Sequence, residues 1–127
     1  MSHFYPRSIR KIVLLAAIFC LSAAQTWAHA KLDHADPAVD GTVKQPPTEV
    51  RLTFSEGVEV SFCRVQVLDA AGQQVDKKDV HGDPKKPREL TVSLPASLGA
   101  GAYKVVWRAV AADTHVTNGE FTFRVEP

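Results

Sequence analysis

From residue 32 onward, hydrophobic residues recur at every second position in short runs, and no stretch has the sustained three-to-four-residue spacing of an amphipathic helix. The clearest runs cover residues 48–55, 90–94, 102–112 and 121–125. Alternation of this kind is typical of strands that have one buried face and one hydrated face. Prolines and glycines separate the runs, as in turns. The pattern therefore predicts an all-β fold.

Two segments fit the alternation less well. In residues 60–69, Phe62 falls on one parity and Val65 on the other, so we expect a β-bulge or a change of face near Cys63–Arg64. Residues 74–88 are mostly polar and are interrupted by one glycine and two prolines, which favours a weak edge strand followed by a loop. Each segment still fits a chain of short strands.

About seven short strands in about 100 residues indicate an antiparallel β-sandwich with Greek-key connections, similar to the immunoglobulin fold. A small closed barrel would show the same periodicity and is the alternative fold. The run 102–112 has Tyr103, Val105 and Trp107 on one parity, which is the strongest core pattern in the chain. No internal repeat or second domain is visible.

Residues 1–28 have the pattern of a secretory signal peptide. Three basic residues precede an apolar run over residues 12–24, and a more polar region with small residues follows. The apolar run is shorter than the roughly 18 to 20 residues that cross a bilayer, so a retained anchor is the weaker alternative. We therefore expect residues 29–127 to form one exported domain.

Two cleavage points fit this leader. Cleavage after Thr26-x-Ala28 would make His29 the first residue, whereas cleavage after Ala30 would make it Lys31. The second point is the better match to the small-x-small preference of signal peptidases. The residues of the leader alone leave both points open.

Charge and cysteine content exclude some functions for the exported part. Three of the 15 basic residues and none of the 14 acidic residues precede residue 29, so the domain is slightly acidic and has no basic surface for nucleic acid. Cys20 lies in the leader, which leaves Cys63 alone and unable to form an internal disulfide. We interpret Cys63 as a small buried hydrophobic residue. The only methionine is Met1.

A candidate metal site lies just ahead of the last hydrophobic run. Asp113 and His115 are two residues apart, so on an extended backbone their side chains would point to the same side. A carboxylate and an imidazole supply two of the ligands that a metal site needs. Short polar triplets are frequent, however, and a hydrogen bond at the end of a strand is the alternative interpretation.

Several motifs, in this order and spacing, resemble the CopC family of periplasmic copper-binding domains. They are His29-Ala30-Lys31-Leu32, Asp36-Pro37-Ala38 with Gly41, Phe54-Ser55-Glu56, Gly101-x-Tyr103-x-Val105-x-Trp107-Arg108, and Asp113-Thr114-His115. The resemblance covers residues 29–127 and implies a Greek-key β-sandwich. That fold agrees with the strand pattern.

The resemblance also implies a set of ligands. The family's Cu(II) site uses the amine and imidazole of an N-terminal histidine, which corresponds to His29, with Asp113 and His115. Glu56 matches a residue that lies at or near the copper in some members, so it is a candidate axial or supporting group. Nitrogen and oxygen donors suit the tetragonal geometry of Cu(II). The site requires cleavage at Ala28 and predicts one Cu(II) per chain.

The implied function is non-enzymatic copper homeostasis, in which a monomer buffers copper, confers resistance or delivers copper to a membrane protein of the CopD type. Some relatives hold Cu(I) in a methionine-rich loop, and the lack of methionine here predicts no such site. The enzyme alternative is a copper monooxygenase, which also binds copper through an N-terminal histidine. Those enzymes are generally larger, and the aromatic residues here fall mostly on core positions.

Overall fold

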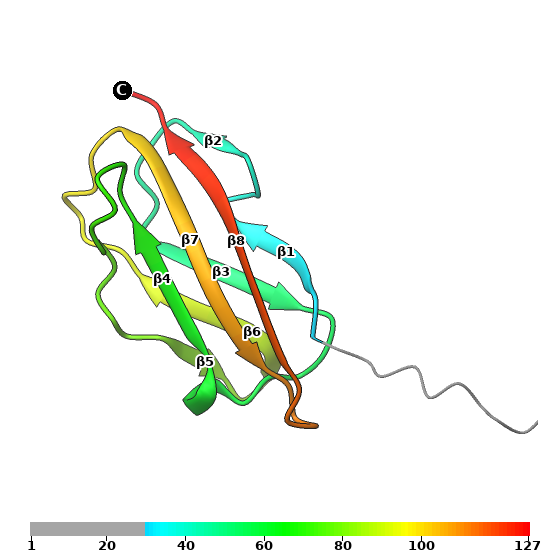
Figure 1. The fold of residues 1–127 in the computed structure, drawn as a ribbon. Helices are drawn as coiled ribbons and strands as arrows, with labels where there is room; N and C mark the ends of the chain where they lie inside the picture. The colour runs from blue at the N-terminus through cyan, green and yellow to red at the C-terminus, as the bar shows by residue number, and fades with distance from the viewer. Residues whose placement is uncertain (1–29) are drawn as a thin grey trace, which may run out of the picture.

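The computed structural model describes residues 30–127, which form two sheets packed face to face (Figure 1). One sheet has the strand order β1-β3-β6-β5 and the other β2-β8-β7-β4. The strands are β1 (Leu32–Asp36), β2 (Thr42–Val43), β3 (Glu49–Phe54), β4 (Arg64–Leu68), β5 (His81–Asp83), β6 (Lys86–Ser93), β7 (Gly101–Val110) and β8 (Val116–Val125). The predicted all-β sandwich is confirmed, with eight strands in this part of the chain rather than about seven.

The connections explain why the fold is a sandwich and not a closed barrel. Only β5–β6 and β7–β8 are neighbours in both sequence and sheet, and every other connection crosses between the sheets. All pairings are antiparallel except the short contact of β2 with β8. Within residues 30–127, no helix is long and apolar enough to cross a bilayer.

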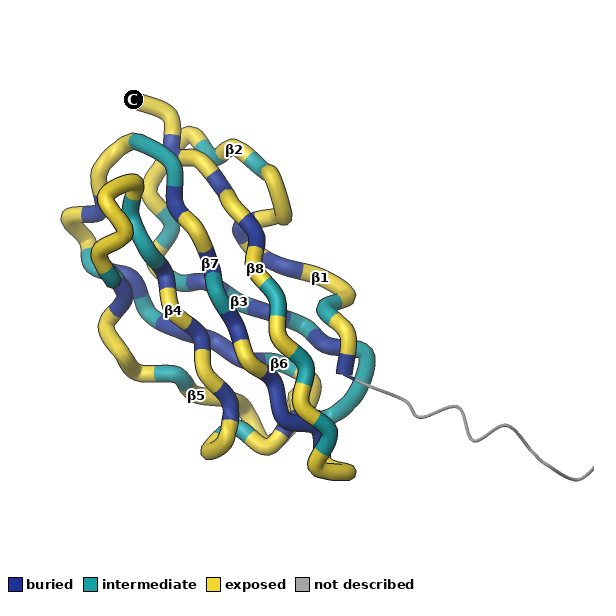
Figure 2. Tube along the Cα trace, viewed as in Figure 1, coloured by how far each residue is buried: buried dark blue, intermediate teal, exposed yellow. Residues whose placement is uncertain are grey.

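The core lies between the two sheets, where the alternating residues face inward (Figure 2). The predicted core positions Tyr103, Val105 and Trp107 are buried in β7. The rings of Trp107 and Phe54 meet edge to face with their centroids 5.2 Å apart, so they join the two sheets. A Cβ atom on Gly119, opposite Trp107 in β8, would lie 2.4 Å from the indole ring, so only glycine leaves room for it.

The expected change of face before β4 is confirmed: a turn of 3-10 helix, η2 (Val60–Phe62), separates the exposed Phe62 from the buried Val65. Two other local predictions were wrong. The edge strand β5 follows the polar loop instead of preceding it, and β6 begins at Lys86. Pro87 is tolerated there because it lies outside the part of β6 that pairs with β3. Finally, β8 begins well before the alternating run 121–125 and pairs with β7 along its whole length.

Candidate metal centre

Asp113 and His115 lie in the tight turn that joins β7 to β8. The Ala111 N–H donates to the His115 carbonyl, and the Thr114 N–H donates to the Ala111 carbonyl, both at 2.9 Å. Thr114 has a φ of 73°, in the left-handed region. This is the arrangement of a three-residue hairpin loop, in which a left-handed residue closes the turn. Glycine or asparagine is the usual choice there, so a β-branched threonine marks local backbone strain.

The turn brings the two predicted ligands together. The His115 N–H donates to Asp113 Oδ1 at 3.2 Å, and His115 Nδ1 lies 3.1 Å from Asp113 Oδ2. The backbone hydrogen bond from His115 is the main cause that lowers the pKa of Asp113 below its ordinary value. The carboxylate is therefore anionic at neutral pH and able to donate oxygen to a cation. The side chains meet through the turn, and not through strand alternation as the sequence suggested.

The beginning of the described chain lies at the same end of the sandwich (Figure 1). Ala30 is fully buried, and its carbonyl accepts a hydrogen bond from Thr117 Oγ1 at 2.6 Å. Lys31 pairs with Ser55 through two hydrogen bonds, from the Lys31 N–H to Ser55 Oγ and from the Ser55 N–H to the Lys31 carbonyl, each at 2.8 Å. Thr117 is two residues after His115, so Ala30 is anchored beside the Asp113/His115 turn.

His29, the predicted N-terminal ligand, lies outside the described residues. Glu56, the candidate supporting group, follows β3 and is half-buried. The carbonyl of the next residue, Gly57, accepts the Ala112 N–H at 3.2 Å, which places the Glu56 loop against the turn. Among residues 30–127, no three His, Cys, Asp or Glu side chains gather closely enough to hold a metal ion.

Two other side chains with potential metal donors, Cys63 and His81, lie elsewhere. Cys63 is buried, with its Sγ accepting the Val110 N–H at 3.3 Å, and burial is the main cause that raises the pKa of its thiol. A protonated, buried thiol is a poor metal ligand, and the interpretation of Cys63 as a small core residue is confirmed. His81 is exposed on β5, with Nδ1 2.7 Å from the Asp79 carbonyl.

Sequence reasoning missed the two hydroxyl residues that anchor the start of the domain. Ser55 stood inside a recognised motif, but no role was assigned to it. Thr117 occupies an inward-facing position of β8, whose other inward positions after Gly119 are buried hydrophobic residues. A polar residue on the core parity is the signal that could have identified Thr117.

Comparisons with known proteins show which family this chain resembles. Residues 32–126 match the family described as the CopC domain. Copper resistance protein C of Pseudomonas syringae pv. tomato is 36% identical over 123 residues, which span 90% of this chain and 94% of that protein. The crystal structure of CopC from Methylosinus trichosporium OB3b gives a TM-score of 0.74 at 35% identity, covering 78% of this chain and 95% of that one. PcoC from Escherichia coli, described as a methionine-rich copper resistance protein, gives 0.69 at 30% identity, covering 78% and 100%.

Proposed function

Because this chain belongs to the CopC family, we propose that it is an exported, non-enzymatic protein that binds copper and either buffers it or passes it to a membrane protein. Relatives named for copper resistance and copper transport support a function related to copper. The single observation that carries the proposal is the anchoring of Ala30 to Thr117, beside the Asp113/His115 pair.

We propose that the ligands are His29, through its amine and imidazole, together with His115 and Asp113. Consecutive Cα atoms are about 3.8 Å apart, so a chain beginning at His29 would start one peptide step from the carbonyl that Thr117 holds. Cleavage after Ala30 would remove a fully buried residue together with this hydrogen bond. Burial of Ala30 therefore supports cleavage after Ala28.

This donor set suits Cu(II). Three nitrogens and one carboxylate oxygen match the tetragonal preference of Cu(II), and the ordinary pKa of an α-amine, about 7.7 to 8.0, lets the metal displace its proton near neutrality. We expect one Cu(II) per chain. Unlike the methionine-rich PcoC, this chain has no methionine after Met1, so we expect no Cu(I) site built on thioethers.

The test is a Cu(II) titration followed by paramagnetic resonance, on exported protein whose first residue is verified as His29. We expect one equivalent with a tetragonal type 2 spectrum. His115→Ala should weaken binding strongly, whereas His81→Ala, at the exposed edge strand, should leave the affinity unchanged. An exported protein that begins at Lys31, or wild-type affinity in His115→Ala, would refute the site.

The same protein separates the binding function from an enzyme. A copper monooxygenase would consume oxygen or peroxide in the presence of ascorbate and a polysaccharide. We expect the copper-loaded protein to show no consumption beyond that of the His115→Ala control. Polysaccharide-dependent turnover in the wild type alone would overturn the non-enzymatic assignment.

A further inference from the structure

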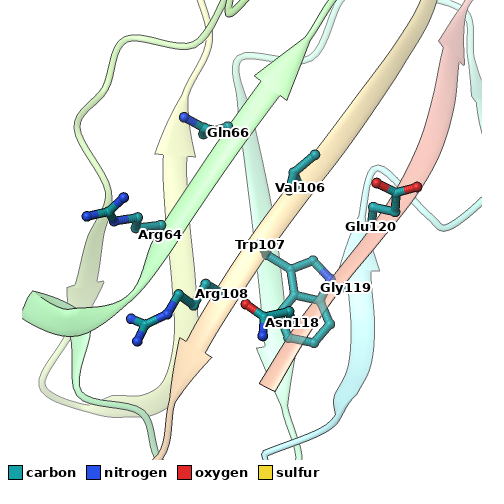
Figure 3. Close-up of a pocket in the computed structure, with 8 residues that line it drawn as sticks. All are labelled: Arg64, Gln66, Val106, Trp107, Arg108, Asn118, Gly119 and Glu120. Carbon is teal, nitrogen blue, oxygen red and sulfur yellow. The ribbon is translucent and has the colours of Figure 1, made fainter. Parts of the chain in front are cut away.

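The outer face of the second sheet carries two arginines directly opposite each other. Arg64 of β4 pairs with Arg108 of β7, which pairs with Asn118 of β8, so three donor side chains form one row across the sheet (Figure 3). Within residues 30–127, neither arginine has a carboxylate within ion-pair distance, and Arg108 donates one hydrogen bond to the Phe62 carbonyl at 2.9 Å. Like charges directly opposite destabilise a sheet, and a bound anion would offset that cost.

The surface around this arginine row is hollowed and partly apolar. A shallow, open hollow of about 350 Å³ covers the row and extends over Val106 and Glu120 of the next row. Phe62, whose carbonyl contacts Arg108, is 63% exposed, and Val116, two residues before Asn118 on the same face, is 44% exposed. Arginine combined with exposed aromatic and aliphatic groups is typical of protein interfaces, whereas small-molecule sites are more enclosed.

We propose that this face, formed by the Arg64–Arg108–Asn118 row with Phe62 and Val116, binds an acidic and partly apolar segment of a partner protein. Guanidinium groups hold carboxylates through paired hydrogen bonds, and the Asn118 amide adds a further donor.

Glu120 and Val116 set the orientation of such a segment. Glu120 repels carboxylates from one side of the row, so the acidic part lies over the arginines and the apolar part extends toward Val116. A lipid surface fits less well, because recognition of anionic lipids takes clusters of roughly four to eight basic residues.

The position of this face connects it to copper. Val116 directly follows His115. A segment whose apolar part extends from the arginine row to Val116 would therefore end beside the proposed metal centre, where it would bring its own ligands to the metal. That connection rests on the proposed function. The docking of an acidic segment does not, because it depends only on the arginine row and its surroundings.

The test uses a blocked synthetic peptide of repeated Glu-Glu-Leu, with a Gln-Gln-Leu peptide as its uncharged counterpart. Binding is followed by ¹⁵N NMR on the exported protein at low ionic strength. We expect shifts confined to the arginine row and its flanks. Arg64→Gln with Arg108→Gln should weaken binding by at least about tenfold, because charge-assisted hydrogen bonds are lost. The matched control, Arg88→Gln with Arg124→Gln, removes two exposed charges elsewhere and should bind like the wild type.

Three results would overturn the proposal. Equal weakening by both double variants would show a general charge effect. Equal binding of the glutamine peptide would remove the role of carboxylates. Binding to phosphatidylglycerol vesicles with the same dependence on Arg64 and Arg108 would assign the face to a membrane. Cu(II) titrations of the wild type and of the Arg64→Gln, Arg108→Gln variant keep the two proposals separate. If the wild type bound the peptide but not copper, only the proposed function would be refuted.

Discussion

Replacement of Thr117 by valine tests whether the start of the domain positions a copper ligand. Thr117 Oγ1 donates to the Ala30 carbonyl at 2.6 Å, and Ala30 is fully buried. Valine is close to threonine in shape but has no hydroxyl, so it removes the donor with little change in packing. The buried carbonyl would then lose this hydrogen bond, and Ala30 would be held less firmly beside the Asp113/His115 turn.

The expected losses of stability and of copper affinity follow from two contributions to the free energy. A buried acceptor that loses its donor costs about 1–3 kcal/mol, so the free energy of unfolding should fall by about that amount. Fixing the backbone of one residue costs about 1–2 kcal/mol of conformational entropy, and copper must now supply this ordering at Ala30. Since about 1.4 kcal/mol corresponds to a factor of ten, copper affinity should fall roughly tenfold.

The assay is a competition titration against a chromophoric copper chelator, on protein verified to begin at His29, with urea unfolding measured in parallel. Thr117→Ser keeps a hydroxyl and should restore much of the affinity. Thr122→Val is the matched control on the same strand, because within residues 30–127 the Thr122 hydroxyl has one hydrogen bond, to the exposed Asp40 carboxylate at 3.3 Å.

One result would refute the reasoning. If Thr117→Val lost stability but bound copper with wild-type affinity, the anchoring of Ala30 would be a structural contact without influence on the metal centre. Equal losses of affinity in Thr117→Val and Thr122→Val would point to a general loosening of β8 instead.

Two further predictions concern the fold. Gly119→Ala should lower the free energy of unfolding by about 1–3 kcal/mol, because its Cβ would lie 2.4 Å from Trp107, whereas Gly99→Ala, with nothing within 4 Å, should be neutral in the same urea titration. Hydrogen bonds from Ser93 lower the pKa of Asp79, so its contribution to stability is complete above its unfolded pKa of about 3.9 and disappears as pH falls through the folded value. Asp79→Asn should therefore destabilise at neutral pH and have little effect in strong acid, and a pH-independent difference would contradict this.

The alternating pattern predicted most of the fold because each long strand buries one face against the opposite sheet, which places hydrophobic residues at every second position. The inward positions of β3 and β7 could be assigned directly from their parity. The pattern predicted the change of face at η2 but not its helical turn, and it did not predict the positions of β5 or of the beginning of β6. These elements are short, or their residues are polar. Their conformation depends on tertiary partners, as when the Val58 N–H donates to the Pro87 carbonyl, and such contacts leave no local periodicity.

The candidate site, like the fold, could be predicted from the sequence only in part. The pairing of Asp113 with His115 was visible as a spacing, although the left-handed Thr114 that makes the turn was not. The bond between Thr117 and Ala30 joins residues 87 positions apart, so no short motif could reveal it. Resemblance to a family supplied the proposed role of His29, which composition and spacing alone could not.

The two halves of the proposed site belong to different layers of the sandwich. His29 would precede β1, an edge strand of one sheet, while His115 lies in the hairpin of the other. With Cys63 the only cysteine in residues 30–127, copper would act as the cross-link that a disulfide provides in many exported domains. Bound metal would stabilise the fold by about 4 kcal/mol when free copper exceeds the Kd a thousandfold. The lifetime of the protein against proteases would then report how much copper surrounds it.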